Sequence, residues 1–264
     1  HMDSPGFAVE AIGPERSAVI PLGKPVFDGP TTEVVLKAAG ERLWLVLQRQ
    51  ESETGPEIYW MPTVPGSRPG DRLCYHGNAA LEADERISGP FLDNRLGCAV
   101  LCELGRQLAK ARPELEVVLG ATTCEEMGGC GAPVLGPALR PDLAICLDAT
   151  YDSMTQGVCP GAGPVLTLSD ASVLLGCRER DRMLAFAESA GFPLQTEVYN
   201  YSGTDARAFP HVGLPTRVYP LLLPTTGNHS PTETADRRDV EALLGLLLAV
   251  CQPGAWRQAF APTF

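Results

Sequence analysis

The sequence predicts an α/β protein, with a mostly parallel sheet covered by helices on both faces and an inserted small β-barrel or β-sandwich domain. Two observations predict this class. After residue 89, apolar runs alternate with segments of helical period, which is typical of parallel strands joined by helices. Between residues 13 and 88, short β-leaning pieces lie between turns rich in proline and glycine. We therefore assign residues 1–12 and 89–264 to the α/β domain and residues 13–88 to the insert.

The elements can be placed in chain order. Residues 6–12 alternate as a strand, and the insert holds β-leaning pieces at 34–36, 43–48 and 72–75. The α/β part opens with a helix over 93–111, whose leucines and valine recur at helical spacing, and with a buried apolar strand over 115–121. A glycine-rich turn and a short helix are expected next. They are followed by strands at 143–147, 161–168, 193–199 and 216–223, helices at 178–190 and 236–251, and a helical turn at 204–209.

Composition limits the classes of function. The chain has 264 residues, of which 44% are hydrophobic and 20% charged, so it can bury a large core and should not be disordered. Its net charge is -11 and it has no lysine or arginine cluster, which argues against a nucleic-acid partner. The longest apolar run, residues 242–250, is too short to span a bilayer, so we expect no membrane segment.

The nine cysteines give a further constraint. Their number is odd, no pair has the Cys-x-x-Cys spacing, and several lie in apolar runs. This favours reduced, buried thiols in a cytoplasmic protein over a disulfide framework or a zinc finger. Cys124 and Cys130 flank the glutamates described next, but no histidine is placed to activate them, so we interpret them as packing residues.

Two adjacent glutamates, Glu125 and Glu126, follow the expected strand at 115–121. At the mouth of a buried strand they would repel each other, and burial would penalise both charges, so a cation beside them is the usual remedy. The alternative is a pair of solvated loop glutamates. In this fold class ligands collect at the carboxyl ends of strands, and Asp148 and His229 also follow expected strands, while Asp93 begins a helix.

Carboxylates combined with imidazole suit Zn²⁺, Co²⁺ or Mn²⁺ better than Ca²⁺. Each residue also has a structural interpretation: Asp93 as a helix N-cap, Asp148 as a turn residue and His229 as an ordinary loop histidine. The convergence of these three positions on Glu125 and Glu126 favours the metal site.

Several segments, in order, carry a resemblance to a known family. They are Gly89-Pro90-Phe91-Leu92-Asp93-Asn94-Arg95-Leu96-Gly97-Cys98, Glu125-Glu126-Met127-Gly128-Gly129-Cys130-Gly131-Ala132, Leu147-Asp148, Gly203-Thr204-Asp205-Ala206 and His229-Ser230-Pro231. From Gly89 onward the chain resembles the glutamyl-aminopeptidase/tetrahedral-aminopeptidase family of di-metal exopeptidases in clan MH, and the β insert fits it as well.

The resemblance implies two divalent metal ions per subunit, Zn²⁺ or Co²⁺ or else Mn²⁺. It implies that Asp93 bridges them, that Glu126 and His229 bind the first, and that Asp148 binds the second. Glu125 would be the general base acting on a metal-bridging water or hydroxide.

The start of the chain, His1-Met2-Asp3-Ser4-Pro5-Gly6-Phe7, also matches the family, which has a His-x-Asp before the β insert. By this match His1 is the second ligand of the second metal, and Asp3 orients its imidazole. Family members have several dozen residues before this point, and His1 could instead be a remnant of an expression tag. Thr204 and Asp205 would line the substrate side, although Asp205 could instead cap a short helix.

The function implied is a metallo-aminopeptidase, a hydrolase that removes N-terminal residues from peptides and assembles as a homo-oligomer. Two alternatives stay open: a related di-metal amidohydrolase or deacylase acting on a small amide, and a non-catalytic relative serving as a binding or assembly subunit. The side-chain preference is not indicated, but a glutamyl preference would require a basic residue, for which Arg207 is a candidate.

Overall fold

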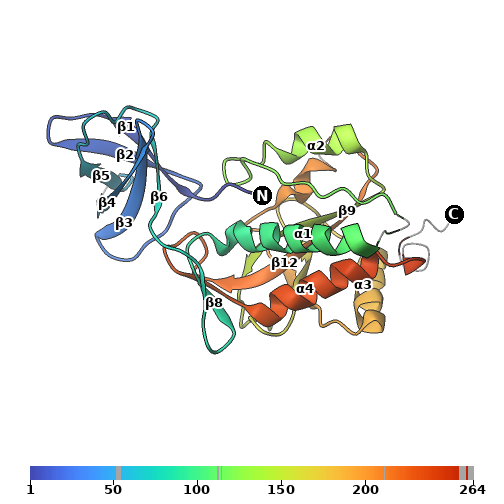
Figure 1. Ribbon diagram of the computed structural model, residues 1–264. Coiled ribbons are helices and arrows are strands. Elements are labelled where there is room, and N and C mark those ends of the chain that lie inside the picture. The colour runs from blue at the N-terminus through green and yellow to red at the C-terminus, as the bar shows by residue number, and fades with distance from the viewer. Residues whose placement is uncertain (52–54, 112, 114, 211, 256–259, 261–264) are drawn as a thin grey trace.

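A computed structural model describes residues 1–264 apart from 52–54, 112, 114, 211, 256–259 and 261–264. Two parts lie side by side in Figure 1: a β-barrel formed by the first third of the chain, and a larger part in which helices pack on a sheet. The chain enters the barrel from residues 1–5, and these residues lie against the larger part, where the backbone N–H of Met2 donates to the carbonyl of Thr122 (2.8 Å).

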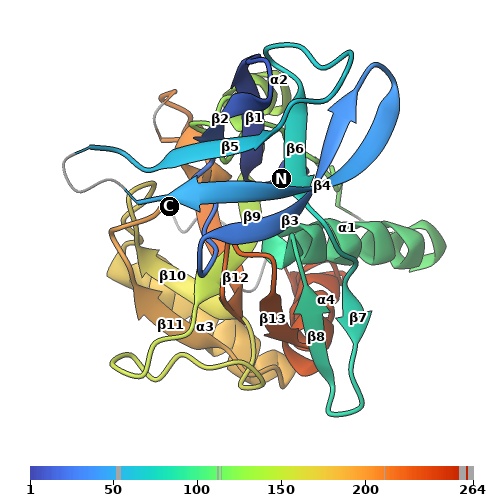
Figure 2. The same ribbon diagram turned by 90° about the vertical axis from the view of Figure 1, so that its left-hand side faces the viewer.

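The insert is a closed, six-stranded antiparallel barrel with strand order β1-β2-β5-β4-β3-β6 (Figure 2). The insert was expected to be a barrel or a sandwich, and the structure confirms the barrel. Phe7, Leu36, Leu47 and Met61 fill its interior and are almost completely buried. Its strands are β1 Gly6–Ala11, β2 Arg16–Leu22, β3 Thr31–Ala38, β4 Glu41–Gln50, β5 Ile58–Pro62 and β6 Arg72–Tyr75.

The larger part contains a seven-stranded sheet ordered β11-β10-β12-β13-β8-β7, with β9 pairing on β12. Among the strands that the structure describes, the β10–β11 and β9–β12 pairings are parallel, whereas the other four pairings of this sheet are antiparallel. The sheet is therefore mixed, and the expected mostly parallel order is not confirmed. The strands are β7 Ala80–Leu81, β8 Arg86–Gly89, β9 Leu143–Tyr151, β10 Val165–Ser169, β11 Gln195–Val198, β12 Arg217–Thr226 and β13 Glu233–Asp236.

Strand pairing shifts two segments relative to the expected division of the chain. β1 pairs with β2 and β6, so residues 6–11 lie in the barrel, although residues 1–12 were assigned to the α/β domain. In contrast, β7 and β8 pair with each other and with β13, so this hairpin lies in the large sheet and not in the insert. Neither boundary has a composition signal, because each depends on a pairing with a strand that is distant in sequence, β1 with β6 and β8 with β13.

Three helices share one hydrophobic core with the sheet: α1 Leu92–Ala111, α3 Cys177–Ala190 and α4 Arg237–Val250. Leu104, Met183, Leu243 and Leu246 from these helices pack with Tyr219 of β12, all almost completely buried. The short helix α2 Ala132–Leu139 packs instead against the 3₁₀ turn η1 Asp205–Ala208. Among the described residues, none of the helices combines the length and hydropathy needed to cross a membrane.

The predicted strand at 115–121 is wrong. This segment has no strand conformation, and its apolar Val118 and Leu119 are 54% and 39% exposed. An apolar run becomes a buried strand only where neighbouring strands satisfy its backbone and cover its side chains. No described strand pairs with residues 115–121, and β9 pairs with β12 alone among the strands described. The segment still delivers Glu125 and Glu126 to the site through the loop that follows it.

Candidate metal centre

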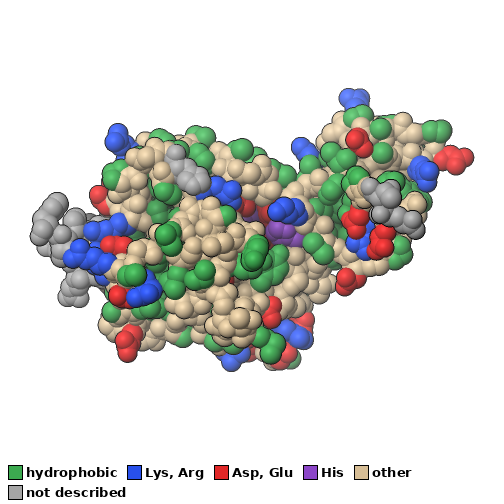
Figure 3. Space-filling view, turned by 180° about the vertical axis from the view of Figure 1, so that it is seen from behind, with side chains coloured by type: hydrophobic (Ala, Val, Ile, Leu, Met, Phe, Trp, Pro, Cys, Tyr) green, Lys and Arg blue, Asp and Glu red, His purple; other side chains and the backbone are tan. Residues whose placement is uncertain are grey.

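The predicted ligands come together where the barrel and the larger part meet. Asp148 lies inside β9, Asp93 begins α1, Glu126 lies in the loop before α2, and His229 lies in the loop between β12 and β13. His1 lies against Asp93 and Asp148. In Figure 3 a histidine surface is visible at the junction of the two lobes, next to acidic and basic side chains.

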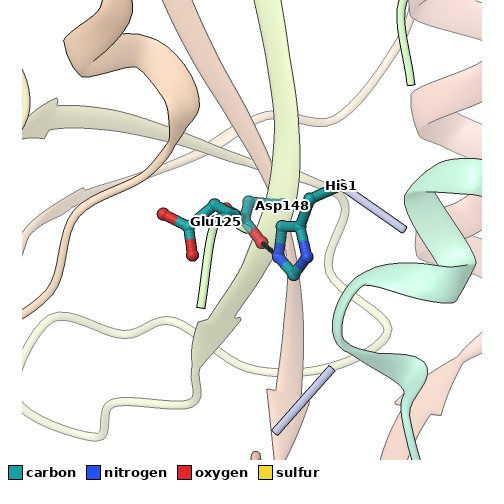
Figure 4. Close-up of side chains that lie close together, drawn as sticks. All are labelled: His1, Glu125 and Asp148. Atoms are coloured by element: carbon teal, nitrogen blue, oxygen red, sulfur yellow. Dashed lines mark hydrogen bonds and ion pairs between the residues drawn. The ribbon is translucent and has the colours of Figure 1, made fainter. Parts of the chain in front are cut away.

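One half of the cluster forms around His1. Its Nε2 atom lies 3.2 Å from Oδ1 of Asp148 and 3.2 Å from Oδ1 of Asp93, and the imidazole is only 2% exposed. The other ring nitrogen, Nδ1, lies 3.0 Å from the backbone carbonyl of Asp3. Figure 4 shows Glu125 beside the pair formed by His1 and Asp148. We call His1 and Asp148 the inner half of the site.

The second half forms around His229. Its Nε2 atom lies 3.3 Å from Oε2 of Glu126 and 3.5 Å from Oδ2 of Asp93, so Asp93 contacts both histidines with different oxygens. Nδ1 of His229 lies 3.2 Å from the carbonyl of Lys24, in the segment that follows β2. The imidazole of His229 is 19% exposed. We call His229 and Glu126 the outer half.

Two further carboxylates hold the backbone of the site in place. Asp3 accepts hydrogen bonds from the backbone N–H groups of Glu125 and Glu126, both at 3.2 Å. Glu233 accepts from the N–H of Asp93 (2.8 Å) and from the N–H of His229 (2.9 Å). Asp3 was expected to orient His1, and it lies 3.5 Å from that ring while also fixing the glutamate loop.

Sequence reasoning missed Glu233. It is 1% exposed and lies in β13, a strand that was not predicted. Its only signal in the sequence is an acidic residue close after His229, and this does not distinguish it from Asp236, which caps α4.

The substrate-side residues cluster near Glu125. The carboxylate of Asp205 hydrogen-bonds the hydroxyl of Thr122, which ties η1 to the glutamate loop. Thr204 is buried and caps η1 by accepting from the N–H of Ala206 (3.2 Å), so the cap that was an alternative role for Asp205 belongs to Thr204. Nη2 of Arg207 lies 3.0 Å from Oε1 of Glu125, which joins a cation to the predicted base.

Cys124 and Cys130 differ from expectation, because both are exposed and not buried packing residues. The loop backbone explains this exposure: Cys124 has a positive φ of 62°, and its carbonyl accepts from the N–H groups of Gly129 and Cys130 (2.9 and 3.2 Å). The tight turn that presents Glu125 inward therefore leaves the thiols outside. All nine cysteines of the chain are free.

Burial and charge crowding perturb the acids of the cluster. Burial, with the nearby charge of Asp148, raises the pKa of Glu125 to about 7. Burial and the charge of Asp93 likewise raise the pKa of Glu126. Burial also opposes ionisation of Asp93, but the imidazoles of His1 and His229 beside it outweigh burial, and its pKa is lowered. Burial disfavours the His229 cation, yet Asp93 and Glu126 raise its pKa to about 9.

These residues fit divalent metal ions. Four buried or nearly buried carboxylates surround two imidazoles, which is a costly arrangement without additional positive charge. Oε1 of Glu126 is buried and has no hydrogen-bond partner among the described residues. Oδ1 of Asp93 likewise makes no hydrogen bond, although His1 lies 3.2 Å away. A mixed set of nitrogen and oxygen ligands with such free acceptor atoms suits Zn²⁺, Co²⁺ or Mn²⁺.

The ligand atoms are also close enough to converge. Those of His1, Asp93 and Glu126 lie within 4.8 Å of one another, and so do those of His1, Glu125 and Asp148. The second group admits Glu125 as a possible ligand, in addition to the predicted base role. His229 contacts Asp93 and Glu126 at the edge of the first group.

Known proteins resemble this chain in sequence and fold. Residues 64–246 match the family model described as M42 glutamyl aminopeptidase. A lysyl aminopeptidase of Pyrococcus furiosus is 27% identical over 285 residues, covering 96% of this chain and 80% of that protein. A glutamyl aminopeptidase of Lactococcus lactis is 30% identical over 148 residues, covering 54% of this chain and 41% of that protein. Other aminopeptidase relatives are longer, and the chain spans 52–56% of the length of two of them.

Solved structures share the fold of this chain. An aminopeptidase from the archaeon Desulfurococcus kamchatkensis superposes with a TM-score of 0.84 at 22% identity, covering 100% of this chain and 81% of that one. The TET1 peptidase of Pyrococcus horikoshii, which can assemble into a tetrahedron or a large octahedral shell, has a TM-score of 0.82 at 23% identity, covering 96% and 82%. The family match spans more than half of the residues and includes all predicted ligands except His1. The chain therefore belongs to the M42 glutamyl aminopeptidase family.

Proposed function

We propose that this protein is a di-metal aminopeptidase that removes N-terminal residues from peptides. The observation that carries the proposal is the cluster centred on Asp93, which contacts His1 through one oxygen and His229 through the other. In the proposed site Asp93 would contribute to holding both ions, His1 and Asp148 would hold the inner one, and Glu126 and His229 would hold the outer one. Two such ions, when bound, would polarise the scissile carbonyl and lower the pKa of a bound water.

Within this site Glu125 has the geometry of a general base. Its carboxylate is 9% exposed and lies next to the inner half, and in the metal-free protein burial raises its pKa to about 7. A carboxylate in this position can take up a proton from a bound water and release it to the leaving amine. Asp3 fixes its backbone N–H, and Arg207 holds one carboxylate oxygen, so the base is oriented from two sides.

Glu125→Gln tests this division of roles. The amide keeps the shape of the side chain but cannot accept a proton, so kcat on aminoacyl p-nitroanilides should fall by about 10²–10⁴ while metal content stays near two ions per chain. Glu126→Gln should instead reduce the metal content. Equal metal loss in both variants would contradict the separate roles and would favour Glu125 as a ligand.

The substrate class is tested with the same metal-loaded protein. Hydrolysis of free-amine substrates supports the aminopeptidase, whereas hydrolysis of N-acylated substrates alone would favour a deacylase. Absence of both metal binding and hydrolysis with added Zn²⁺ or Co²⁺ would favour a non-catalytic relative. We also propose that the chain forms homo-oligomers, which the assembly of the TET1 peptidase supports, and which light scattering of the protein in solution tests.

A further inference from the structure

Arg207 is a cation at the rim of an acidic site. It belongs to η1, and its guanidinium is 30% exposed, whereas the Glu125 carboxylate that it contacts is 9% exposed. Among the described residues, Glu125 is the only carboxylate within ion-pair distance of Arg207. The side chain therefore joins the buried base to the solvent side of the site.

The arginine is held in one orientation. Its Nε atom donates to the carbonyl of Thr204 (3.0 Å), and Nη2 donates to Oε1 of Glu125 (3.0 Å). Thr204 is itself fixed, because its N–H donates to the hydroxyl of Ser172 (2.7 Å) and its carbonyl accepts from that hydroxyl (3.0 Å). These contacts anchor the guanidinium at two of its nitrogens.

Two glycines make room for the side chain. A Cβ atom at Gly129 would lie 3.1 Å from Cδ and from Nε of Arg207, and Gly129 also has a φ of 69°. A Cβ atom at Gly203 would lie 3.1 Å from Nη2. The arginine thus lies in a slot between the loop that carries Glu125 and the loop that leads into η1, where larger side chains would displace it.

Two of the five N–H groups of the guanidinium are used in this way, and no described residue accepts the other three. A planar, fixed guanidinium with free donors matches a carboxylate in a two-point contact. A peptide can offer a carboxylate from two sources, an acidic N-terminal side chain or the free C-terminus of a dipeptide.

We propose that Arg207 is a specificity-determining residue that binds a carboxylate of the substrate while it holds Glu125. This inference rests on the proposed aminopeptidase function and names the residue that selects the substrate. Charge-assisted contacts of this kind change affinity by roughly 10–100-fold.

Matched substrates test the proposal. Glutamyl and glutaminyl p-nitroanilides differ only in the side-chain charge, and leucyl-alanine and leucyl-alaninamide differ only in the terminal charge. The metal-loaded protein should favour the carboxylate member of one pair by about 10-fold or more in kcat/KM. The pair that shows the preference identifies the source. Arg207→Gln should abolish that preference, Arg207→Lys should keep part of it, and Arg178→Gln, in an exposed position of α3, should leave it unchanged.

An equal loss of kcat on all four substrates in Arg207→Gln would overturn the proposal, because it would show that Arg207 only positions Glu125. The absence of a preference in both pairs for the unchanged protein would overturn it as well.

Calorimetry separates this inference from the proposed function. If the metal-loaded protein hydrolyses none of the four substrates, the aminopeptidase proposal fails, yet binding can still be measured with L-glutamate and L-glutamine. Tighter binding of glutamate, lost in Arg207→Gln, would support the carboxylate site. Equal binding of the two amino acids would refute it.

Discussion

The two halves of the site differ in what holds them. In the inner half, Asp148 lies within β9, and all nine residues of β9 pair with β12, while the His1 imidazole is 2% exposed. In the outer half, Glu126 and His229 lie on loops, and the His229 imidazole is 19% exposed. Position on a paired strand fixes a ligand more firmly than position on a loop. We therefore expect the inner half to keep its metal longer than the outer half.

Asp93 joins the halves, so its replacement should have the largest effect. Asp93→Asn removes a charge from both proposed ions, and metal affinity should fall at least about 100-fold in both halves, with activity lost. Metal analysis after dialysis against a weak chelator measures this. Asp28→Asn, in an exposed loop of the barrel, is the matched control. Retention of one full metal equivalent in Asp93→Asn would show that the halves do not share this ligand.

Variants that remove a ligand from only one half of the site test the difference between the two halves. Asp148→Asn and His229→Ala should each leave about one metal ion per chain, because each removes a ligand from one half only. Asp148→Asn should also lower the thermal stability of the metal-free protein less than a core mutation would, since the amide keeps the shape of the side chain. Loss of both ions from either variant would indicate a single shared site.

The metal-free protein should respond to pH in a defined direction. The folded-state pKa of Glu125 is raised from 4.5 to about 7 because burial disfavours its charge, and burial raises the pKa of Asp148 and Glu126 as well. Raised pKa values mean that the folded state binds protons more tightly than the unfolded chain does. The contribution of Glu125 to the free energy of unfolding is therefore fully present below about pH 4.5 and is lost as the pH rises through 7.

Between pH 5 and 8 the melting temperature of the metal-free protein should therefore fall, by about 3–6 °C for a chain of this size. Bound metal stabilises the ionised carboxylates, so the melting temperature of the metal-loaded protein should fall much less over the same pH range. Calorimetric scans of both forms measure the difference. Parallel pH profiles would argue against metal ions bound by these acids.

Asp3→Asn should have the smallest effect. Asp3 contacts the inner half through His1 and the glutamate loop through two backbone N–H groups, so its loss should weaken metal binding by about 10-fold. His229 has no such carboxylate on Nδ1, which contacts the carbonyl of Lys24 instead. The change in Asp3→Asn should accordingly be greater at the inner ion, which titration of the two metal equivalents would resolve.

Local sequence signals predicted the barrel and the helices, and they pointed to residues that cluster in the candidate site. The glycine-rich turn after Glu126 and the helical period after Asp93 are local features, and both appear in the structure. The segment 115–121 shows where such signals fail, because its apolar composition says nothing of whether a neighbouring strand exists. The direction of strand pairing in the large sheet failed for the same reason, since it depends on contacts between distant segments.

The candidate site shows the same limit. Asp93, Glu126, Asp148 and His229 could be proposed because they follow or begin regular elements and match a family motif. Glu233 was missed because its role consists of two backbone contacts made across the sequence, to residues 93 and 229. Arg207 could be named only as a candidate, since its pairing with Glu125 depends on the fold of η1 against the glutamate loop.

In the proposed site one carboxylate, Asp93, would bridge two metal ions held by unlike ligand sets. A crystal structure of the Zn²⁺-loaded protein, with anomalous scattering measured at the zinc edge, tests it most directly. Two zinc peaks are expected on either side of Asp93, one within about 2.2 Å of His1 and Asp148 and the other within that distance of Glu126 and His229. A single peak, or a peak ligated by Glu125 in place of Glu126, would contradict the account.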